Sequence, residues 1–232
     1  MTKKVLPEKK KAPGKKKKTL KVLVTGFDPF GGETVNPAFE AVKRLPASVA
    51  GAGVEVLEIP TVFRKSIDAI MRHVEEGGAD RVLMVGQAGG RFEMTVERIG
   101  INVDDARIPD NEGNQPVDEP IDPDGPAAYF ATIPVKAVVE RIRKIGVPAK
   151  VSNTAGTFVC NHVLYGVLNE IAKREMPVKA GFIHVPYLPE QVVAKDSLPS
   201  MSAETIASAL EAAVEALVLT GKDAKIGGGT EH

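Results

Sequence analysis

Cys160 is the only cysteine of the chain and the side chain best able to act as a covalent nucleophile. It follows a turn of small and polar residues, and the apolar side chains after it recur at helical spacing, which predicts a helix over 158–172. Cys160 then lies near the helix N-terminus, where free N–H groups and the helix dipole lower the pKa of a thiol and favour the nucleophilic thiolate. A lone cysteine is also commonly a small buried apolar residue, so a structural role stays open at this point.

A cysteine nucleophile needs a base, and the chain has four histidines. His232 lies in the C-terminal tail, and His73 has charged neighbours that indicate a solvated helix face. His162 follows Cys160 by two residues, so on a helix the two side chains point about 200° apart and His162 is badly placed as its base. His184 lies near the end of an apolar strand and is the best candidate. From its position alone, it could also be a hydrogen-bonded core residue.

A third group must hold the imidazole in its productive tautomer. Glu97 lies between apolar residues in a predicted strand and is the best candidate acid, although a surface pair with Arg98 would explain it equally well. The sequence has no H-E-x-x-H motif and no Cys/His cluster, so we expect no metal and no cofactor.

Short apolar strands alternate with amphipathic helices, which predicts an α/β domain with a mostly parallel sheet. Strands are predicted at 21–25, 54–59, 82–85, 95–103, around 151 and at 181–185, and helices at 37–45, 67–74, 135–142, 158–172 and 203–219. Ligands of such sheets bind beyond the carboxyl ends of the strands. Three loops follow predicted strands there: 26–32 (GFDPFGG), 86–91 (GQAGGR) and 184–187 (HVPY).

The glycine-rich loops match neither the phosphate-binding nor the dinucleotide-binding motif, which argues against a nucleotide site. Phe27 and Phe30 in the first loop could plug the core or line a flat apolar slot. The segment 107–126 contains five prolines and little that could be buried, so it could be a lid, a subunit contact or a solvated connection.

The formal net charge of the 232 residues is zero, but it is unevenly distributed. Residues 1–18 carry nine Lys and one Glu, a balance of +8 against −8 for the rest. We therefore expect a disordered Lys-rich tail over 1–19, a folded domain over 20–219 and a flexible C-terminal tail over 220–232. The basic tail could be a solvated extension or a nucleic-acid tether. One cysteine, no membrane-length apolar run and no secretory pattern lead us to expect a cytoplasmic protein without a membrane segment.

Four parts of the chain resemble the pyroglutamyl-peptidase I (pyrrolidone-carboxylate peptidase) family of cysteine peptidases. They are KVLVTGFDPFGGETVNP (21–37), VGQAGGR (85–91), TVERIGINVDDARIPDNEGNQP (95–116) and the pair AGTFVCNHVLYG (155–166) with GFIHVPYLPEQ (181–191). The likeness covers roughly 20–219. It implies a single α/β domain with helices on both faces of the sheet, in which Cys160 is the nucleophile, His184 the base and Glu97 the group that orients it.

The resemblance also implies a reaction, which is hydrolysis of the amide bond after an N-terminal pyroglutamate through a thioester. Phe27 and Phe30 would line the pyroglutamate pocket, with Asn36 and Gln87 at the substrate site and Arg91 near the oxyanion hole. Dimers or tetramers are expected. Two rival interpretations stay open here. One is a different enzyme on a similar fold, such as a nucleoside phosphorylase or another cysteine amidase, and the other is a binding protein that acts through its Lys-rich tail.

Overall fold

A seven-stranded sheet in the order β2-β3-β1-β4-β9-β5-β8 forms the centre of the molecule, and the computed structural model describes residues 19–229 of the chain. Its strands are β1 (Lys21–Phe27), β2 (Ser48–Val49), β3 (Ala52–Ile59), β4 (Arg81–Gln87), β5 (Met94–Glu97), β8 (Ala149–Ser152) and β9 (Lys179–Val185). The central strands β3, β1, β4 and β9 are parallel, whereas β5 runs antiparallel to β9 and parallel to β8. The predicted mostly parallel sheet is confirmed.

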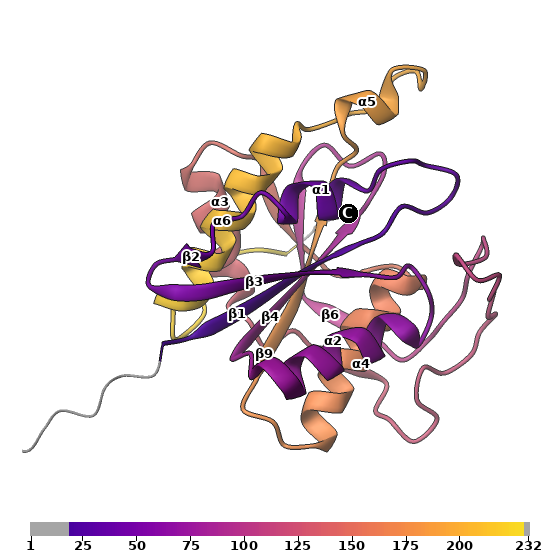
Figure 1. Ribbon diagram of the computed structural model, residues 1–232, viewed down its shortest axis with the longest axis horizontal. Coiled ribbons are helices and arrows are strands. Elements are labelled where there is room, and N and C mark those ends of the chain that lie inside the picture. Colours follow the sequence, from indigo (N-terminus) through magenta and orange to yellow (C-terminus); the bar gives the residue numbers. More distant parts are fainter. Residues whose placement is uncertain (1–18, 230–232) are drawn as a thin grey trace, which may run out of the picture.

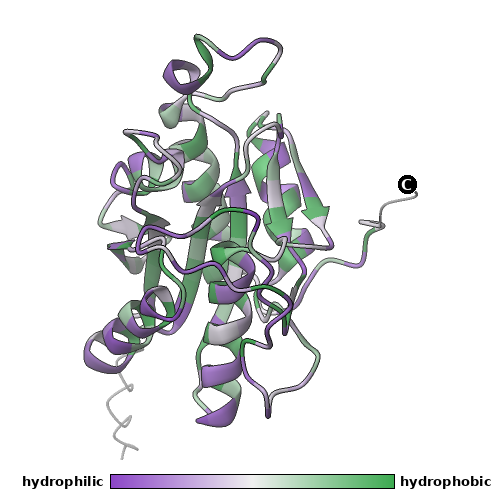
Figure 2. Cartoon of the chain, turned by 90° about the vertical axis from the view of Figure 1, so that its right-hand side faces the viewer, coloured by the Kyte–Doolittle hydropathy of each residue, from purple (hydrophilic) through white to green (hydrophobic). Residues whose placement is uncertain are grey.

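Helices cover both faces of the sheet, as predicted (Figure 1). One layer contains α1 (Pro37–Val42), α3 (Val135–Lys144) and α6 (Ala203–Leu219), and the other contains α2 (Lys65–Gly77) and α4 (Val159–Lys173). Two apolar cores fill the space between the sheet and these layers. Figure 2 shows the apolar strands enclosed by helices whose outward sides are hydrophilic.

The central strands are apolar on both faces because each face is covered by a helix layer. In β1, Val22 and Val24 belong to the core under α1 and α6, whereas Leu23 belongs to the core under α2 and α4. Successive residues of a strand therefore face opposite helix layers. Only side chains on the face covered by α2 and α4 can contact Cys160.

The predicted strand or hairpin over 95–103 divides into two elements at Arg98. β5 joins the main sheet, and β6 (Ile99–Ile101) pairs with β7 (Ala128–Phe130) in a separate two-stranded sheet. The first predicted helix ends at Val42 instead of reaching Leu45. Three short elements were not predicted: β2, β7 and α5 (Pro189–Val192) have two to four residues, too few to show a periodicity.

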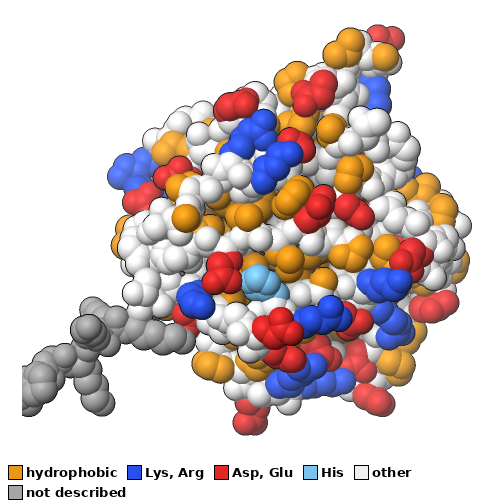
Figure 3. Space-filling model, viewed as in Figure 1, with side chains coloured by type: hydrophobic (Ala, Val, Ile, Leu, Met, Phe, Trp, Pro, Cys, Tyr) orange, Lys and Arg blue, Asp and Glu red, His pale blue; other side chains and the backbone are white. Residues whose placement is uncertain are grey.

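The described part of the C-terminal segment, 220–229, lies against the folded domain. The Asp223 carboxylate accepts the N–H of Ala137 at 2.9 Å, and Arg98 donates to the carbonyl of Gly228 at 2.8 Å. The Lys-rich segment 1–18 falls outside the described residues, so its predicted disorder stays a prediction. Within 19–229, no helix is long and apolar enough to span a membrane. Figure 3 shows acidic and basic side chains interspersed over the face seen in Figure 1.

Candidate active site

The β5–β9 ladder brings Glu97 and His184 together. Thr95 is opposite His184 in this antiparallel pair, and Glu97 is opposite Phe182, so all four side chains are on one face. Glu97 and His184 are then diagonal neighbours, which is within reach of long side chains. The imidazole Nδ1 lies 2.8 Å from the Glu97 carboxylate oxygen Oε1, with side-chain exposures of 5% and 0%. The predicted contact between these two residues is therefore present and buried.

Cys160 lies on the same side of the sheet, in the first turn of α4. A Cβ placed on Gly86 would be 3.0 Å from its sulfur, and Gly86 is the partner of His184 in the β4–β9 ladder. The thiol thus packs over the strand next to the histidine. Among the described residues its thiol has no hydrogen-bond partner, and the hydrogen bonds of active sites often form only when substrate binds.

The position of α4 is fixed by the residue that follows the cysteine. The Asn161 amide is fully buried, accepts the N–H of Ile101 at 2.9 Å and donates to the carbonyls of Ile101 and Val103 at 2.9 Å. The helix therefore cannot shift relative to β6 without breaking three hydrogen bonds. At the N-cap, Phe158 offers no side-chain acceptor, so backbone N–H groups of the first turn stay available beside the sulfur.

The Glu97 carboxylate is held by more than the histidine. Arg91 donates to Oε1 at 3.0 Å and also bonds the Thr95 hydroxyl, which lies 3.4 Å from the same oxygen. Burial raises the pKa of Glu97, but the hydrogen bond and charge of His184, with the nearby Ser152 hydroxyl and the Arg91 charge, outweigh burial and leave the pKa below its ordinary value. Glu97 is therefore a carboxylate at neutral pH.

The electrostatics of Cys160 differ from the sequence prediction. A helix N-terminus was expected to lower the thiol pKa, but burial and the Glu97 charge raise it to about 12, with Arg91 acting in the opposite direction. The resting side chain is accordingly a neutral thiol. A nucleophilic role for Cys160 would therefore require a base, since little thiolate is present at rest.

Three phenylalanine rings, those of Phe30, Phe63 and Phe158, pack together at the start of α4 and are called the aromatic wall below. Phe158 lies two residues before Cys160, and its ring centroid is 6.2 Å from that of Phe30 and 5.5 Å from that of Phe63. Phe27 is 2% exposed and packs in the core, 6.3 Å from Phe182, so its predicted place in the substrate pocket stays a prediction. Phe158 and Phe63 were missed by sequence reasoning. The F-V-C sequence was a usable signal for Phe158, whereas nothing local indicated Phe63.

The other two predicted substrate residues support loops near this wall. The Asn36 side chain caps α1 by accepting the N–H of Ala38 at 3.0 Å, and it donates to the carbonyl of Asp28 at 2.9 Å. Gln87 accepts a hydrogen bond at 3.0 Å from Gln191 in α5. Their predicted contacts with substrate stay predictions.

Part of the proline-rich segment 107–126 is tied to the same region. Asp110 is buried and accepts the N–H of Phe63 at 2.9 Å, and the Asn111 amide donates to the carbonyl of Pro29 at 2.9 Å. This segment thus holds the two loops that carry Phe63 and Phe30, which favours a fixed wall over a mobile lid.

Comparison with known proteins decides the family. The model of the pyroglutamyl peptidase family matches residues 20–220. This chain belongs to that family. It is 58% identical over 210 residues to a pyrrolidone-carboxylate peptidase of Clostridium perfringens, which covers 90% of this chain and 99% of that protein. It is 56% identical over 214 residues to one of Treponema denticola, with coverage of 90% and 99%.

Solved structures agree with the sequence relatives. The pyroglutamyl peptidase I of Bacillus amyloliquefaciens superposes with a TM-score of 0.88 at 50% identity, over 90% of this chain and all of that one. A mutant pyrrolidone carboxyl peptidase of Pyrococcus furiosus gives 0.82 at 43% identity, over 86% and 98%. The predicted fold and family are confirmed. The chain is a cysteine peptidase of the class that removes N-terminal pyroglutamate, and both rival interpretations lose their support.

Proposed function

We propose that Cys160, His184 and Glu97 hydrolyse the amide bond after an N-terminal pyroglutamate. The Cys160 sulfur attacks the pyroglutamyl carbonyl while His184 takes the thiol proton, so that a carbon–sulfur bond forms and the carbonyl becomes an oxyanion. The oxyanion collapses, the carbon–nitrogen bond breaks, and His184 gives its proton to the leaving amine. Water, deprotonated by His184, then attacks the thioester and releases pyroglutamate and the free thiol.

Proton transfer during the attack follows from the charges of the site. A thiol whose pKa is raised to about 12 does not hold its charge at rest, and the buried Glu97 carboxylate disfavours a thiolate nearby. The same carboxylate favours the imidazolium, which forms when His184 takes the proton. Glu97 therefore acts on the base, and its hydrogen bond to Nδ1 leaves Nε2 for the chemistry.

The oxyanion is held by N–H groups at the start of α4. Among the described residues, no side chain caps this end of the helix, so its first backbone N–H groups are free to donate to the oxyanion. Each oxyanion donor typically contributes a factor on the order of 10²–10³ to the rate. Arg91 borders the same region from the loop after β4, where its hydrogen bonds to Glu97 and Thr95 also hold the carboxylate in place.

Specificity is assigned to the aromatic wall. Phe30 and Phe158 are half-buried and offer flat apolar surface beside the sulfur, which suits the flat, uncharged lactam ring of pyroglutamate. An ordinary aminopeptidase would need a carboxylate for the substrate ammonium. Proline has such an ammonium and lacks the ring carbonyl, so a prolyl substrate should be rejected strongly.

The observation that carries this proposal is the buried Glu97–His184 hydrogen bond next to the N-terminal turn that holds Cys160. The test is release of a fluorogenic amine from pyroglutamyl and prolyl amides by wild type and Cys160→Ala. We expect release from the pyroglutamyl amide alone, and none from the variant. Equal release by wild type and variant would contradict the role of Cys160, and no release by folded wild type would contradict the reaction.

The expected assembly and location belong to this proposal too. Val193, 86% exposed, and Leu198 lie on the segment that projects beyond α5 (Figure 1), and apolar side chains exposed in this way support self-association into a dimer or tetramer. Light scattering of Val193→Asp beside wild type would test this, and an unchanged mass would remove this segment from the interface. A free cysteine agrees with a reducing compartment such as the cytoplasm.

A further inference from the structure

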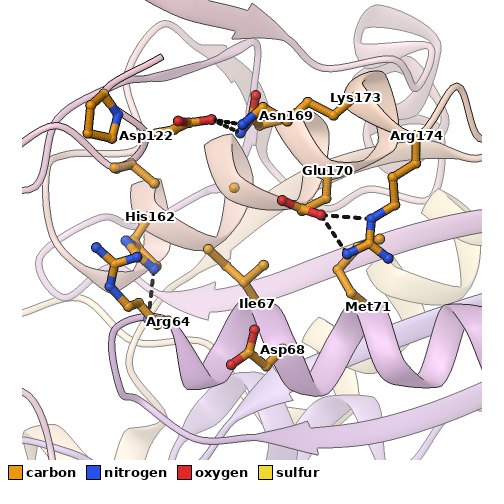
Figure 4. A pocket seen from close by; sticks show the side chains of 13 residues that line it. Arg64, Ile67, Asp68, Met71, Asp122, His162, Asn169, Glu170, Lys173 and Arg174 are labelled. Carbon is orange, nitrogen blue, oxygen red and sulfur yellow. Dashed lines mark hydrogen bonds and ion pairs between the residues drawn. The ribbon is translucent and has the colours of Figure 1, made fainter. Parts of the chain in front are cut away.

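His162 is a second buried histidine, and the mechanism above does not use it. It lies on α4 two residues after Cys160 and is 1% exposed. Its Nδ1 is 2.7 Å from the Asp104 carboxylate. Its Nε2 accepts the backbone N–H of Arg64 at 2.8 Å, the contact between these two residues drawn in Figure 4. The ring adjoins a cleft of about 510 Å³ between α2 and α4.

The hydrogen bonds fix the state of this ring. An Nε2 that accepts an N–H carries no proton, so the proton is on Nδ1 and is donated to Asp104. Both ring nitrogens are therefore engaged, and His162 has no free nitrogen with which to serve Cys160. Any role of His162 must therefore come from the groups that it hydrogen-bonds, which are Asp104 and the backbone of Arg64.

It holds a strained turn. Arg64 has φ 63° and ψ −51°, a left-handed conformation that is strained for a residue other than glycine. The preceding amide, that of Phe63, is bonded by the buried Asp110 carboxylate at 2.9 Å. Two consecutive N–H groups are thus fixed by buried side chains from two other segments, which keeps the turn in one conformation.

The turn at Phe63 and Arg64 positions the aromatic wall. The Phe63 ring packs edge-on against His162, with centroids 5.2 Å apart, and edge-on against Phe158, with centroids 5.5 Å apart. Phe158 contacts Phe30 at 6.2 Å and lies two residues before the cysteine. A continuous line of rings therefore leads from His162 to the predicted pyroglutamate slot.

We propose that His162, with Asp104, is a positioning residue for substrate binding: it holds the 63–64 turn so that Phe63 keeps Phe158 against the substrate ring. This inference rests on the proposed function, because it assigns a role in the same slot. The two buried histidines near Cys160 thus have different roles. His184 exchanges a proton with the sulfur, whereas His162 positions the aromatic wall.

The test measures the slot and the nucleophile separately. In His162→Ala we expect KM for a pyroglutamyl amide to rise about tenfold or more, since the wall loses its support. The rate at which iodoacetamide alkylates Cys160 should stay within about twofold of wild type, because this small reagent does not need the slot. His162→Gln should restore KM, because one amide can accept from Arg64 and donate to Asp104 as the ring does.

The matched control is His73→Ala. His73 also pairs with a carboxylate, Glu55, at 2.8 Å, but it lies on α2 away from the wall, so its removal should leave KM unchanged. If His162→Ala does not fold, Phe63→Leu tests the next step of the same line and should also raise KM at constant alkylation rate.

Three outcomes would overturn the proposal. An unchanged KM in the folded His162→Ala or Phe63→Leu variant would do so, as would KM and alkylation rate changing together, or a His162→Gln variant that folds but behaves like His162→Ala. If folded wild type does not cleave the pyroglutamyl amide, the proposed function is refuted instead. The role of His162 in substrate binding is then refuted as well.

Discussion

Replacing Glu97 with Gln removes a buried charge and keeps the shape of the side chain. Oε1 of Glu97 receives donors from both His184 and Arg91. A Gln side chain would place its carbonyl oxygen there, because its NH₂ group cannot accept either donor. The histidine tautomer should therefore be kept, and the substitution isolates the effect of the negative charge.

The magnitude follows from the separation of the charges. A carboxylate and an imidazolium about 4 Å apart interact by about 4 kcal/mol at an effective dielectric constant of about 20. This stabilisation acts when His184 holds the proton, and at about 1.36 kcal/mol per tenfold its loss lowers kcat by about 10³. The Arg91 guanidinium, left without its charge partner, disfavours the imidazolium further.

The assay is kcat on a pyroglutamyl amide, with Glu211→Gln as the control, because Glu211 is exposed on α6 and should tolerate the same change. Circular dichroism shows whether the fold is retained. A folded Glu97→Gln variant with kcat within about tenfold of wild type would refute the reasoning, because the carboxylate would then not support the base.

Three further predictions concern the thiol and the segment that supports the aromatic wall. Gly86→Ala should lower both kcat and thermal stability, the latter by about 1–3 kcal/mol, because its Cβ would lie 2.7 Å from Phe182 and 3.0 Å from the Cys160 sulfur. Gly53→Ala, with open space around its Cβ, is the control, and equal effects in thermal melts and kinetics would contradict the argument. Iodoacetamide alkylation of Cys160 should rise about tenfold per pH unit between about pH 6 and pH 9, because its pKa is raised to about 12, and a plateau in this range would indicate a preformed thiolate. Hydrogen bonds from Asn114 and from the backbone N–H groups of Phe63, Asn114 and Glu112 outweigh burial and lower the pKa of Asp110, so its stabilisation is complete above the ordinary carboxyl pKa and lost as pH falls through the folded one. Asp110→Asn should therefore lower the melting temperature at pH 7 and reduce its decline on acidification, and a parallel decline would contradict this.

The fold was largely predictable because the strong patterns are local. The apolar strands β1, β4 and β9 and the amphipathic helices α2, α3 and α4 each carry their periodicity within one segment. The division of 95–103 at Arg98 was not predictable, because it depends on which distant strand pairs with each half. The end of helix α1 at Val42 was not predictable either, because the apolar spacing continues to Leu45.

The candidate site was predictable only where a residue type restricts its own chemistry. A single cysteine at a helix start and a strand histidine were informative by themselves, whereas Glu97 as the third member relied on the family resemblance. The thiol pKa was predicted in the wrong direction, because burial and the Glu97 charge come from the fold. Phe63 and Asp110 were missed for the same reason, since their roles depend on contacts across 47 residues of sequence.

The most direct test of the central claim is to identify the atom that carries the acyl group. Wild type is mixed with a pyroglutamyl ester, quenched in acid within the first turnovers, digested and weighed by mass spectrometry, with Cys160→Ala alongside. The account predicts a pyroglutamyl adduct on the peptide that contains Cys160, absent from the variant, which should also fail to turn over. Turnover by the variant, or an adduct on any other residue, would contradict it.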